Sequence, residues 1–169
     1  MELRRILAPF DFSEAAQNAA RYAGELAVHF DAEVTLLHVL PPLHYDFAMT
    51  EPSVEQLKEV NERRRANALQ ALTAMMPSLL EARHAECQVI EGDVADEIIA
   101  AANNDAFDAV VMSTRGASAF RRLFMIGSVT SKVLHGALRP VITSVHFEHR
   151  QSPLACMQET AFWYHDRQR

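Results

Sequence analysis

From residue 107 to residue 128 the chain reads FDAVVMSTRGASAFRRLFMIGS. An apolar run from Phe107 to Met112 leads into a loop that contains Gly116 and Gly127, two of only five glycines in the 169 residues. Ser128 then opens a segment with helical character. Many α/β proteins hold phosphate with a strand, a glycine loop and a helix start, because backbone N–H groups and the helix dipole favour an anion there. The stretch therefore predicts a nucleotide-binding site.

Outside this stretch, segments typical of strands alternate with segments typical of helices. We expect strands over 3–9, 33–40, 85–90, 107–112 and 140–145, and helices over 14–30, 54–76, 94–103 and 128–135. Such alternation predicts βαβ units and right-handed crossovers. The expected fold is α/β, Rossmann-like or flavodoxin-like: a five-stranded parallel sheet in the order 3-2-1-4-5 with helices on both faces. This domain would span 1–147, followed by a polar C-terminal extension over 148–169.

Composition and charge narrow the function classes. The chain is 49% apolar with a net charge of -6, which argues against non-specific binding to nucleic acid or to an anionic membrane. It has neither the apolar core of a signal peptide nor a run of about 18 apolar residues, so we expect a cytoplasmic protein. Its two cysteines, Cys87 and Cys156, are expected to be free thiols.

A second candidate feature ends the first expected strand, at Pro9-Phe10-Asp11. Ligands of open α/β sheets bind beyond the carboxyl ends of the strands, where the strand order reverses. A carboxylate at Asp11 could accept hydrogen bonds from a ribose or an adenine, and Gly116 and Gly127 would let the backbone approach phosphates. The alternative interpretation of Asp11 is a turn residue before a helix cap, and that of the glycines is loop geometry alone.

Five segments of the chain resemble, in order and spacing, the universal stress proteins: Ile6–Glu14, Leu36–Val39, Asp108–Gly116, Gly127–Thr130 and Arg139–Ile142. The resemblance covers about residues 3 to 146. It implies a five-stranded parallel sheet and a homodimer joined through the last strand, 140–145. It also implies a module for stress response or signalling that binds ATP or another adenine nucleotide.

The ATP-binding branch of that family carries Gly-x2-Gly-x9-Gly-Ser/Thr. By this resemblance, the adenine and ribose would contact Pro9, Phe10, Asp11 and Val39, and the phosphates would contact Met112, Gly116, Gly127, Ser128, Val129 and Thr130. Ser113 and Arg115, beside Gly116, are further candidate contacts, and Arg121 and Arg122 could supply charge or form a solvated face. Two departures from the motif are Ser113 in place of the first glycine and a ten-residue spacer, 117–126. They leave open a member that binds no ATP and acts only through protein contacts.

The sequence does not indicate an enzyme. No lysine follows either loop glycine, no acid–base pair is evident, and Ser13 is better explained as a helix cap than as a nucleophile. Slow ATP hydrolysis would need Mg²⁺ between the phosphates and the loop hydroxyls. His38 is expected to be a hydrogen-bonded core residue, and the pair His146 and His149 does not predict a metal site.

Overall fold

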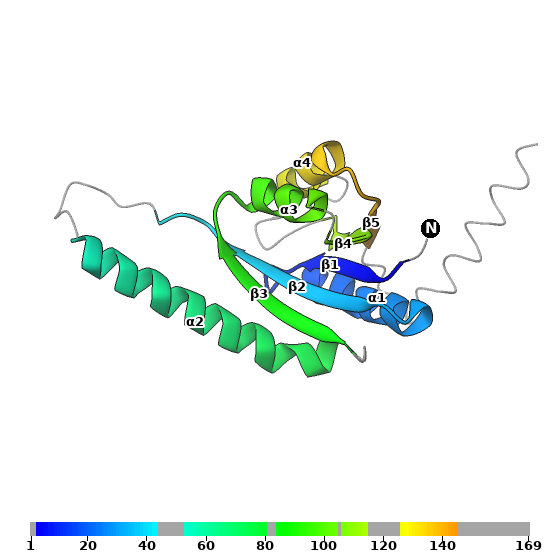
Figure 1. The fold of residues 1–169 in the computed structure, drawn as a ribbon, viewed down its shortest axis with the longest axis horizontal. Coiled ribbons are helices and arrows are strands. Elements are labelled where there is room, and N and C mark those ends of the chain that lie inside the picture. Colours follow the sequence, from blue (N-terminus) through cyan, green and yellow to red (C-terminus); the bar gives the residue numbers. More distant parts are fainter. Residues whose placement is uncertain (1–2, 44–52, 81–83, 105, 115–125, 145–169) are drawn as a thin grey trace, which may run out of the picture.

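The computed structural model describes residues 3–43, 53–80, 84–104, 106–114 and 126–144. Along the chain the elements are β1 (Arg5–Pro9), α1 (Glu14–Phe30), β2 (Glu33–Leu40), α2 (Val54–Leu79), β3 (Ala85–Glu91), α3 (Val94–Asn103), β4 (Ala109–Ser113), α4 (Ser128–Gly136) and β5 (Val141–Ser144). The strands form one parallel sheet in the order β3-β2-β1-β4-β5 (Figure 1). This confirms the predicted fold class and strand order.

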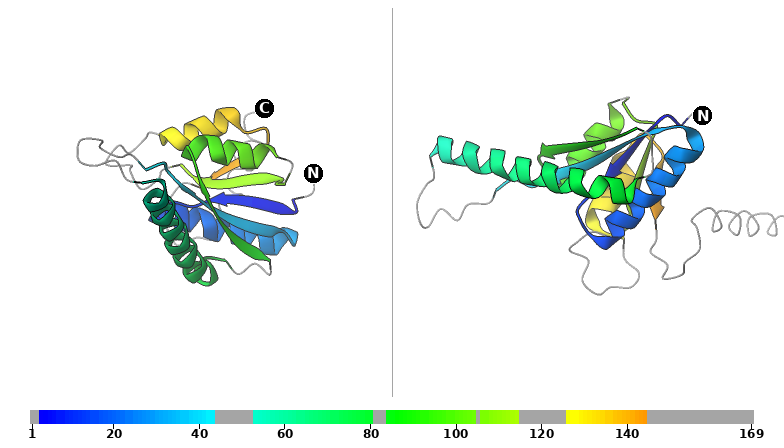
Figure 2. Two further views of the ribbon diagram at one scale, coloured as in Figure 1. Left: turned by 60° about the vertical axis from the view of Figure 1, so that its left-hand side comes forward. Right: turned by 90° about the horizontal axis from the view of Figure 1, so that it is seen from below.

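Helices α1 and α2 cover one face of the sheet, and α3 and α4 cover the other (Figures 1 and 2). Successive side chains of a strand point to opposite faces, so Ile6 and Ala8 pack toward α1 and α2 while Leu7 packs toward α3 and α4. The sheet is therefore buried on both faces, which explains the nearly continuous apolar runs of β2 and β4.

Several strand boundaries differ from the prediction. β1 begins at Arg5 rather than residue 3, and β4 spans Ala109–Ser113 rather than 107–112. β1 begins where it starts to pair with β2, at Arg5 opposite Glu33, and its pairing with β4 begins at Ile6 opposite Ala109. The Asp108 side chain accepts from the backbone N–H groups of Arg4 and Arg5 just before that point. β3 extends by one residue, to Glu91. β5 begins at Val141, because the preceding proline has no N–H for the ladder.

Helix α2 continues through Pro77, which the sequence predicts to end or kink it, and finishes at Leu79. The Leu80 N–H still donates to the Met76 carbonyl at 2.9 Å. Leu79 and Leu80 are buried, and Leu80 packs against Gly24 of α1, where a Cβ would approach its side chain to 3.2 Å. This packing outweighs the penalty of a proline near the helix end. No helix in the described ranges is both long and apolar enough to cross a membrane.

Candidate functional site

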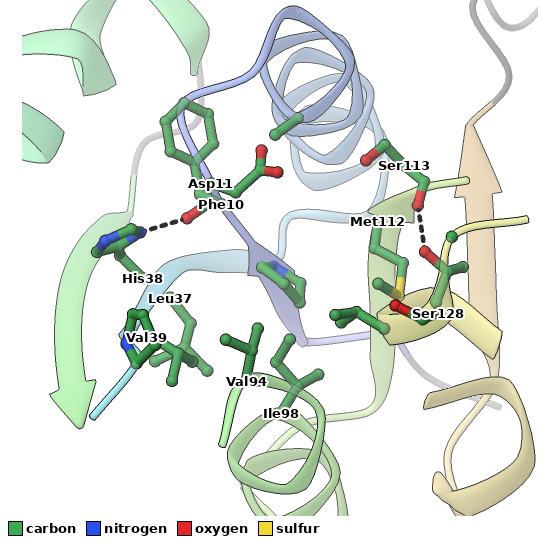
Figure 3. Close-up of a pocket in the computed structure, with 16 residues that line it drawn as sticks. Phe10, Asp11, Leu37, His38, Val39, Val94, Ile98, Met112, Ser113 and Ser128 are labelled. Carbon is green, nitrogen blue, oxygen red and sulfur yellow. Dashed lines mark hydrogen bonds between the residues drawn. The ribbon is translucent and has the colours of Figure 1, made fainter. Parts of the chain in front are cut away.

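A cavity of about 420 Å³ opens at the carboxyl ends of β1, β2 and β4 (Figure 3). After β1 and β2 the chain crosses to the face that carries α1 and α2, whereas after β4 it crosses to the face that carries α4. The cavity thus lies at the point where open α/β sheets leave a crevice for a ligand. We call it the main cavity.

The main cavity brings together the sequence-predicted contact residues that the structure describes. These are Pro9, Phe10, Asp11, Val39, Met112, Ser113, Gly127, Ser128, Val129 and Thr130. The predicted contacts Arg115 and Gly116 lie outside the described residues, as do Arg121 and Arg122. Segments that are more than 100 residues apart in the sequence therefore line the same cavity. Their contact with a ligand remains a prediction.

Where β1 ends, the chain stays tied to β2 for one further residue. The Phe10 N–H donates to the Leu37 carbonyl at 2.8 Å. The Phe10 carbonyl accepts from His38 Nδ1 at 2.7 Å, so Nδ1 carries the proton (Figure 3). His38 is hydrogen-bonded as predicted, but it is half-buried and lines the main cavity instead of lying in the core. This anchor fixes the corner from which Asp11 extends.

Asp11 is half-buried, and its Oδ1 accepts from the Ser13 N–H at 3.1 Å and from the Ser13 hydroxyl at 2.5 Å. Ser13 Oγ in turn accepts from the Ala16 N–H at 3.1 Å, which confirms Ser13 as the cap of α1. Between them Phe12 adopts a φ of 65°, a conformation uncommon for a bulky residue. The backbone at this corner is thus held in a strained turn that presents the Asp11 carboxylate at the cavity.

The floor of the main cavity is apolar. Leu37 and Val39 come from β2, Val94 and Ile98 from α3, and Met112 from the end of β4 (Figure 3). All but Val94 are buried. A flat apolar group could therefore be buried here against aliphatic side chains.

Opposite Asp11, the chain enters α4 at Gly127, the residue that precedes the first helical turn. The Gly127 N–H donates to the Thr114 carbonyl at 2.8 Å. The Thr130 hydroxyl donates to the Ser113 carbonyl at 3.0 Å, which ties α4 to β4. The hydroxyl proton of Thr130 is therefore engaged by β4, and the contact of Thr130 with a ligand remains a prediction. Ser128 is exposed at the rim.

Six further residues line the main cavity that the sequence did not suggest as contacts: Ala16, Leu37, His38, Pro41, Val94 and Ile98. Leu37 lies two positions before the predicted contact Val39, so the period of a strand could have identified it. Val94 and Ile98 are four apart on α3 and share a helix face. No local signal shows that this face reaches the end of β4.

Candidate metal ligands and the cysteines are placed as follows. Among the described residues, no three side chains of His, Cys, Asp and Glu lie together as a metal site would require. Cys87 is free, as predicted, and burial raises the pKa of its thiol, which keeps it in the less reactive protonated form. Cys156, His146 and His149 lie outside the described part of the chain.

Comparison with known proteins gives a consistent result. The model of the universal stress protein family matches residues 2–144. A universal stress protein of Methanocaldococcus jannaschii is 30% identical over 139 residues, which cover 82% of this chain and 80% of the relative. The solved structure of UspA from Lactobacillus plantarum superposes with a TM-score of 0.72 at 26% identity, over 86% of this chain and 99% of that one.

Other solved relatives of the same fold hold adenine nucleotides. One is a universal stress protein in complex with cAMP, at 19% identity and a TM-score of 0.61, over 86% of this chain and 99% of that one. Another is the Archaeoglobus fulgidus protein in complex with dAMP, at 23% identity and a TM-score of 0.55, over 85% and 98%. From the family model, the relative and the shared fold together, we conclude that this chain belongs to the universal stress protein family.

Proposed function

We propose that the protein is an adenine-nucleotide-binding module that acts in stress response or signalling in the cytoplasm. One observation carries the proposal: the main cavity combines an apolar floor, the Asp11 carboxylate and the first turn of α4. A nucleotide carries groups complementary to these three features, which are a flat base, a ribose with hydroxyl donors and an anionic phosphate. The cavity volume of about 420 Å³ lies in the range of small-molecule sites.

The base and the ribose would occupy the part of the cavity nearest β1 and β2. Leu37, Val39 and Ile98 offer an aliphatic surface on which an adenine ring can be buried. Asp11 Oδ1 is engaged by Ser13, but a carboxylate has about four acceptor sites. Asp11 can therefore also accept from the ribose hydroxyls, which is the role we assign to it.

The phosphates would bind at the first turn of α4, where we assign the contacts to the N–H groups of Ser128, Val129 and Thr130. Within the described residues these groups have no hydrogen-bond acceptor, and Gly127 has no side chain that could cap them. N–H groups at a helix start combine with the helix dipole to favour an anion. The nucleotide would thus place its base on the apolar floor, its ribose at Asp11 and its phosphates at the first turn of α4.

The choice of an adenine nucleotide is supported by the solved relatives with bound cAMP and dAMP. We propose ATP, with Mg²⁺ on its phosphates, as the ligand to test first, and AMP and cAMP beside it. Turnover is not part of the proposal.

We also propose a homodimer through β5. This strand lies at the sheet edge and pairs only with β4 in the described part of the chain. Its side chains are all half-buried, and Leu138 just before it is 84% exposed. An edge strand with unpaired backbone groups and apolar side chains at Val141 and Ile142 is suited to pair with a second copy. Light scattering on the concentrated protein should give twice the mass of the chain, and a monomer would refute the dimer.

The alternative is a family member that binds no ATP and acts through protein contacts alone. Ser113 favours it, because this serine stands where the ATP-binding branch has its first glycine and its side chain is buried at the end of β4. A Cβ at this point narrows the space in which phosphates can approach the backbone.

Two measurements separate these functions. The purified protein is denatured and any released nucleotide is identified, and the protein is then titrated calorimetrically with ATP, AMP and cAMP, with and without Mg²⁺. The absence of both carried nucleotide and binding heat at millimolar ATP would leave only the alternative.

The variant Asp11→Asn sharpens the test, because its amide oxygen can still accept from Ser13 while the charge is lost. We expect it to weaken nucleotide affinity by roughly tenfold, the effect of losing a hydrogen bond to a charged group, with an unchanged melting temperature. Asp96→Asn, at an exposed position of α3 outside the cavity, is the matched control and should bind like the wild type. Equal affinity of all three proteins would remove Asp11 from the site.

A further inference from the structure

A second, smaller cavity adjoins the main one and is not used by the site described so far. Its volume is about 270 Å³, and it shares Pro41, Val94, Ser128 and Val129 with the main cavity. We call it the side cavity. Because both cavities are lined by Ser128, the side cavity lies next to the part of the main cavity at the start of α4.

The side cavity differs from the main cavity in its charges. Its lining includes Asp93 of the α3 start and Lys132 of α4, and these are the charged side chains that line it in the described residues. Lys132 is four positions after Ser128, so the two side chains lie on the same face of the helix, one turn apart. Side chains of an α-helix tilt toward its N-terminus, which directs the Lys132 ammonium toward Ser128.

Lys132 is held loosely in this structure. Its Nζ lies 3.8 Å from Asp93 Oδ1, and the two side chains are 60% and 57% exposed. Asp93 does not depend on this contact, because its Oδ1 also accepts from the N–H groups of Ala95 at 3.1 Å and Asp96 at 3.3 Å. An exposed ion pair of this length contributes little to stability, so Lys132 can leave Asp93 at small cost.

We propose that Lys132 recognises the outer phosphates of the nucleotide and makes the site prefer a di- or triphosphate to a monophosphate. The inference rests on the proposed function and adds a specificity residue to it. A monophosphate at the first turn of α4 is served by backbone N–H groups alone. Further phosphates extend into the side cavity, where their charge is larger than that of Asp93 and attracts the ammonium of Lys132.

The test compares ATP, ADP, AMP and adenosine on the wild type, Lys132→Ala, Lys132→Arg and Lys58→Ala. Lys58 is the only other lysine of the chain and lies exposed on α2, which makes Lys58→Ala the matched control. We expect Lys132→Ala to weaken ATP binding by roughly three- to tenfold and to leave adenosine and AMP within about twofold. Lys132→Arg should retain the preference, and Lys58→Ala should match the wild type.

Chemical labelling gives a second readout with an internal reference. Both lysines are acetylated with an excess of a soluble acetylating reagent, and the modified positions are quantified by mass spectrometry. We expect ATP to protect Lys132 severalfold, AMP to protect it little, and Lys58 to react equally in all samples. Equal labelling of Lys132 with and without bound ATP would contradict the proposed contact.

The outcomes separate the inference from the function on which it rests. If the wild type binds adenosine and AMP but Lys132→Ala binds ATP with unchanged affinity, the specificity role is wrong and the nucleotide site stands. If Lys132→Ala loses ATP, AMP and adenosine equally, the residue acts on the fold and the inference is also wrong. If the wild type binds none of these ligands, the proposed function fails first.

Discussion

At the amino end of the sheet, Asp108 Oδ2 accepts from the backbone N–H groups of Arg4 and Arg5, each at 2.8 Å. At the carboxyl end, α4 begins at Gly127, which has no side chain to accept from the N–H groups of its first turn. Neighbouring backbone N–H groups thus lie at both ends of the parallel sheet. At the start of β1 they donate to a carboxylate of the protein itself, whereas at the start of α4 they are left for an anion from solution.

The other helices show that the start of α4 is not the general rule in this fold. Ser13, Ser53 and Asp93 each accept from first-turn N–H groups of α1, α2 and α3, respectively. A side-chain cap of this kind stabilises a helix by about 1 kcal/mol. The chain forgoes that stability at α4, the helix whose first turn is the proposed phosphate position, and this supports a functional role for the missing cap.

The largest expected effect on nucleotide affinity comes from placing a carboxylate at the start of α4, as Asp108 does at the start of β1. Gly127 has φ -61° and ψ 151°, which any residue can adopt, so Gly127→Asp would place a carboxylate at the cap of α4. That carboxylate would occupy the N–H groups and repel the phosphates. We expect nucleotide affinity to fall by about a hundredfold, as two like charges a few ångström apart require, with an equal or higher melting temperature. Calorimetric titration and thermal unfolding measure the two effects.

Gly127→Ser is the matched control, because it adds a cap without a charge. Its nucleotide affinity should lie between those of the wild type and Gly127→Asp, since the hydroxyl competes for the same N–H groups but does not repel the ligand. If Gly127→Asp binds ATP as tightly as the wild type, the phosphates do not bind at the start of α4, and the proposed difference between the two ends is wrong.

At the amino end, the same logic predicts a loss of stability rather than of binding. Asp108→Ala removes the acceptor of both N–H groups, and we expect it to lower the free energy of unfolding by about 1–2 kcal/mol, since this half-buried site is partly screened by solvent. Asp108→Asn keeps an acceptor and should lose less. Urea unfolding at neutral pH measures both, and nucleotide affinity should not change in either variant.

The Asp108 effect should also depend on pH. Hydrogen bonds from the Arg4 N–H, then from the Arg5 N–H, together with nearby arginine charges, lower the pKa of Asp108 although partial burial opposes the shift. A lowered folded-state pKa gives stability that is complete above the unfolded pKa of about 3.9. It is lost as the pH falls from there through the folded pKa. The stability gap between wild type and Asp108→Asn should therefore be constant near neutral pH and shrink in acid; a gap that grows in acid would contradict the assignment.

The two ends also differ in how well the sequence predicts them. Asp11 can be identified because it closely follows an apolar strand, and Gly127 because it ends the glycine loop that follows another, and the carboxyl ends of parallel strands lie at the same end of the sheet. Asp108 gave no such signal, because its partners are more than 100 positions away and are backbone N–H groups of ordinary residues. A local sequence pattern therefore predicts residues at the ligand-binding end of the sheet better than it predicts a hydrogen bond between distant strands.

Errors in the predicted elements have a related origin. Pro77 is a strong local signal for a helix end, yet α2 continues to Leu79 because Leu79 and Leu80 become buried against α1. Val94 and Ile98 were missed as cavity residues because only the packing of α3 across the sheet brings them to the end of β4. In each case a contact between elements overrides or supplements what the neighbouring residues indicate.

The smallest expected effect concerns the rim of the main cavity. Pro41 lies at the rim just after β2, and Pro42 follows it, so this segment has no N–H groups with which to extend the sheet. The Pro41 carbonyl instead accepts from Arg64 Nη2 of α2 at 2.9 Å, while Arg64 Nη1 donates to Asn61 Oδ1 at 3.2 Å. At the carboxyl end of the sheet, an α2 side chain thus binds a backbone carbonyl at the cavity rim. At the amino end, the Asp108 side chain binds backbone N–H groups of β1 instead.

Arg64→Ala should free the Pro41 carbonyl and loosen the rim, and we expect nucleotide affinity to fall by roughly threefold, a fraction of one hydrogen bond's energy. Arg64→Lys, with one donor group in place of a fork, should fall between. Arg63 is the matched control, because it is exposed on the same helix and its ion pair with Glu59, at 3.1 Å, lies on the helix surface. Calorimetric titration measures the nucleotide affinity of the three variants. Equal losses of affinity in Arg63→Ala and Arg64→Ala would mean that the charge of α2 acts on the nucleotide. No loss in Arg64→Ala would mean that binding does not depend on the contact between Arg64 and Pro41.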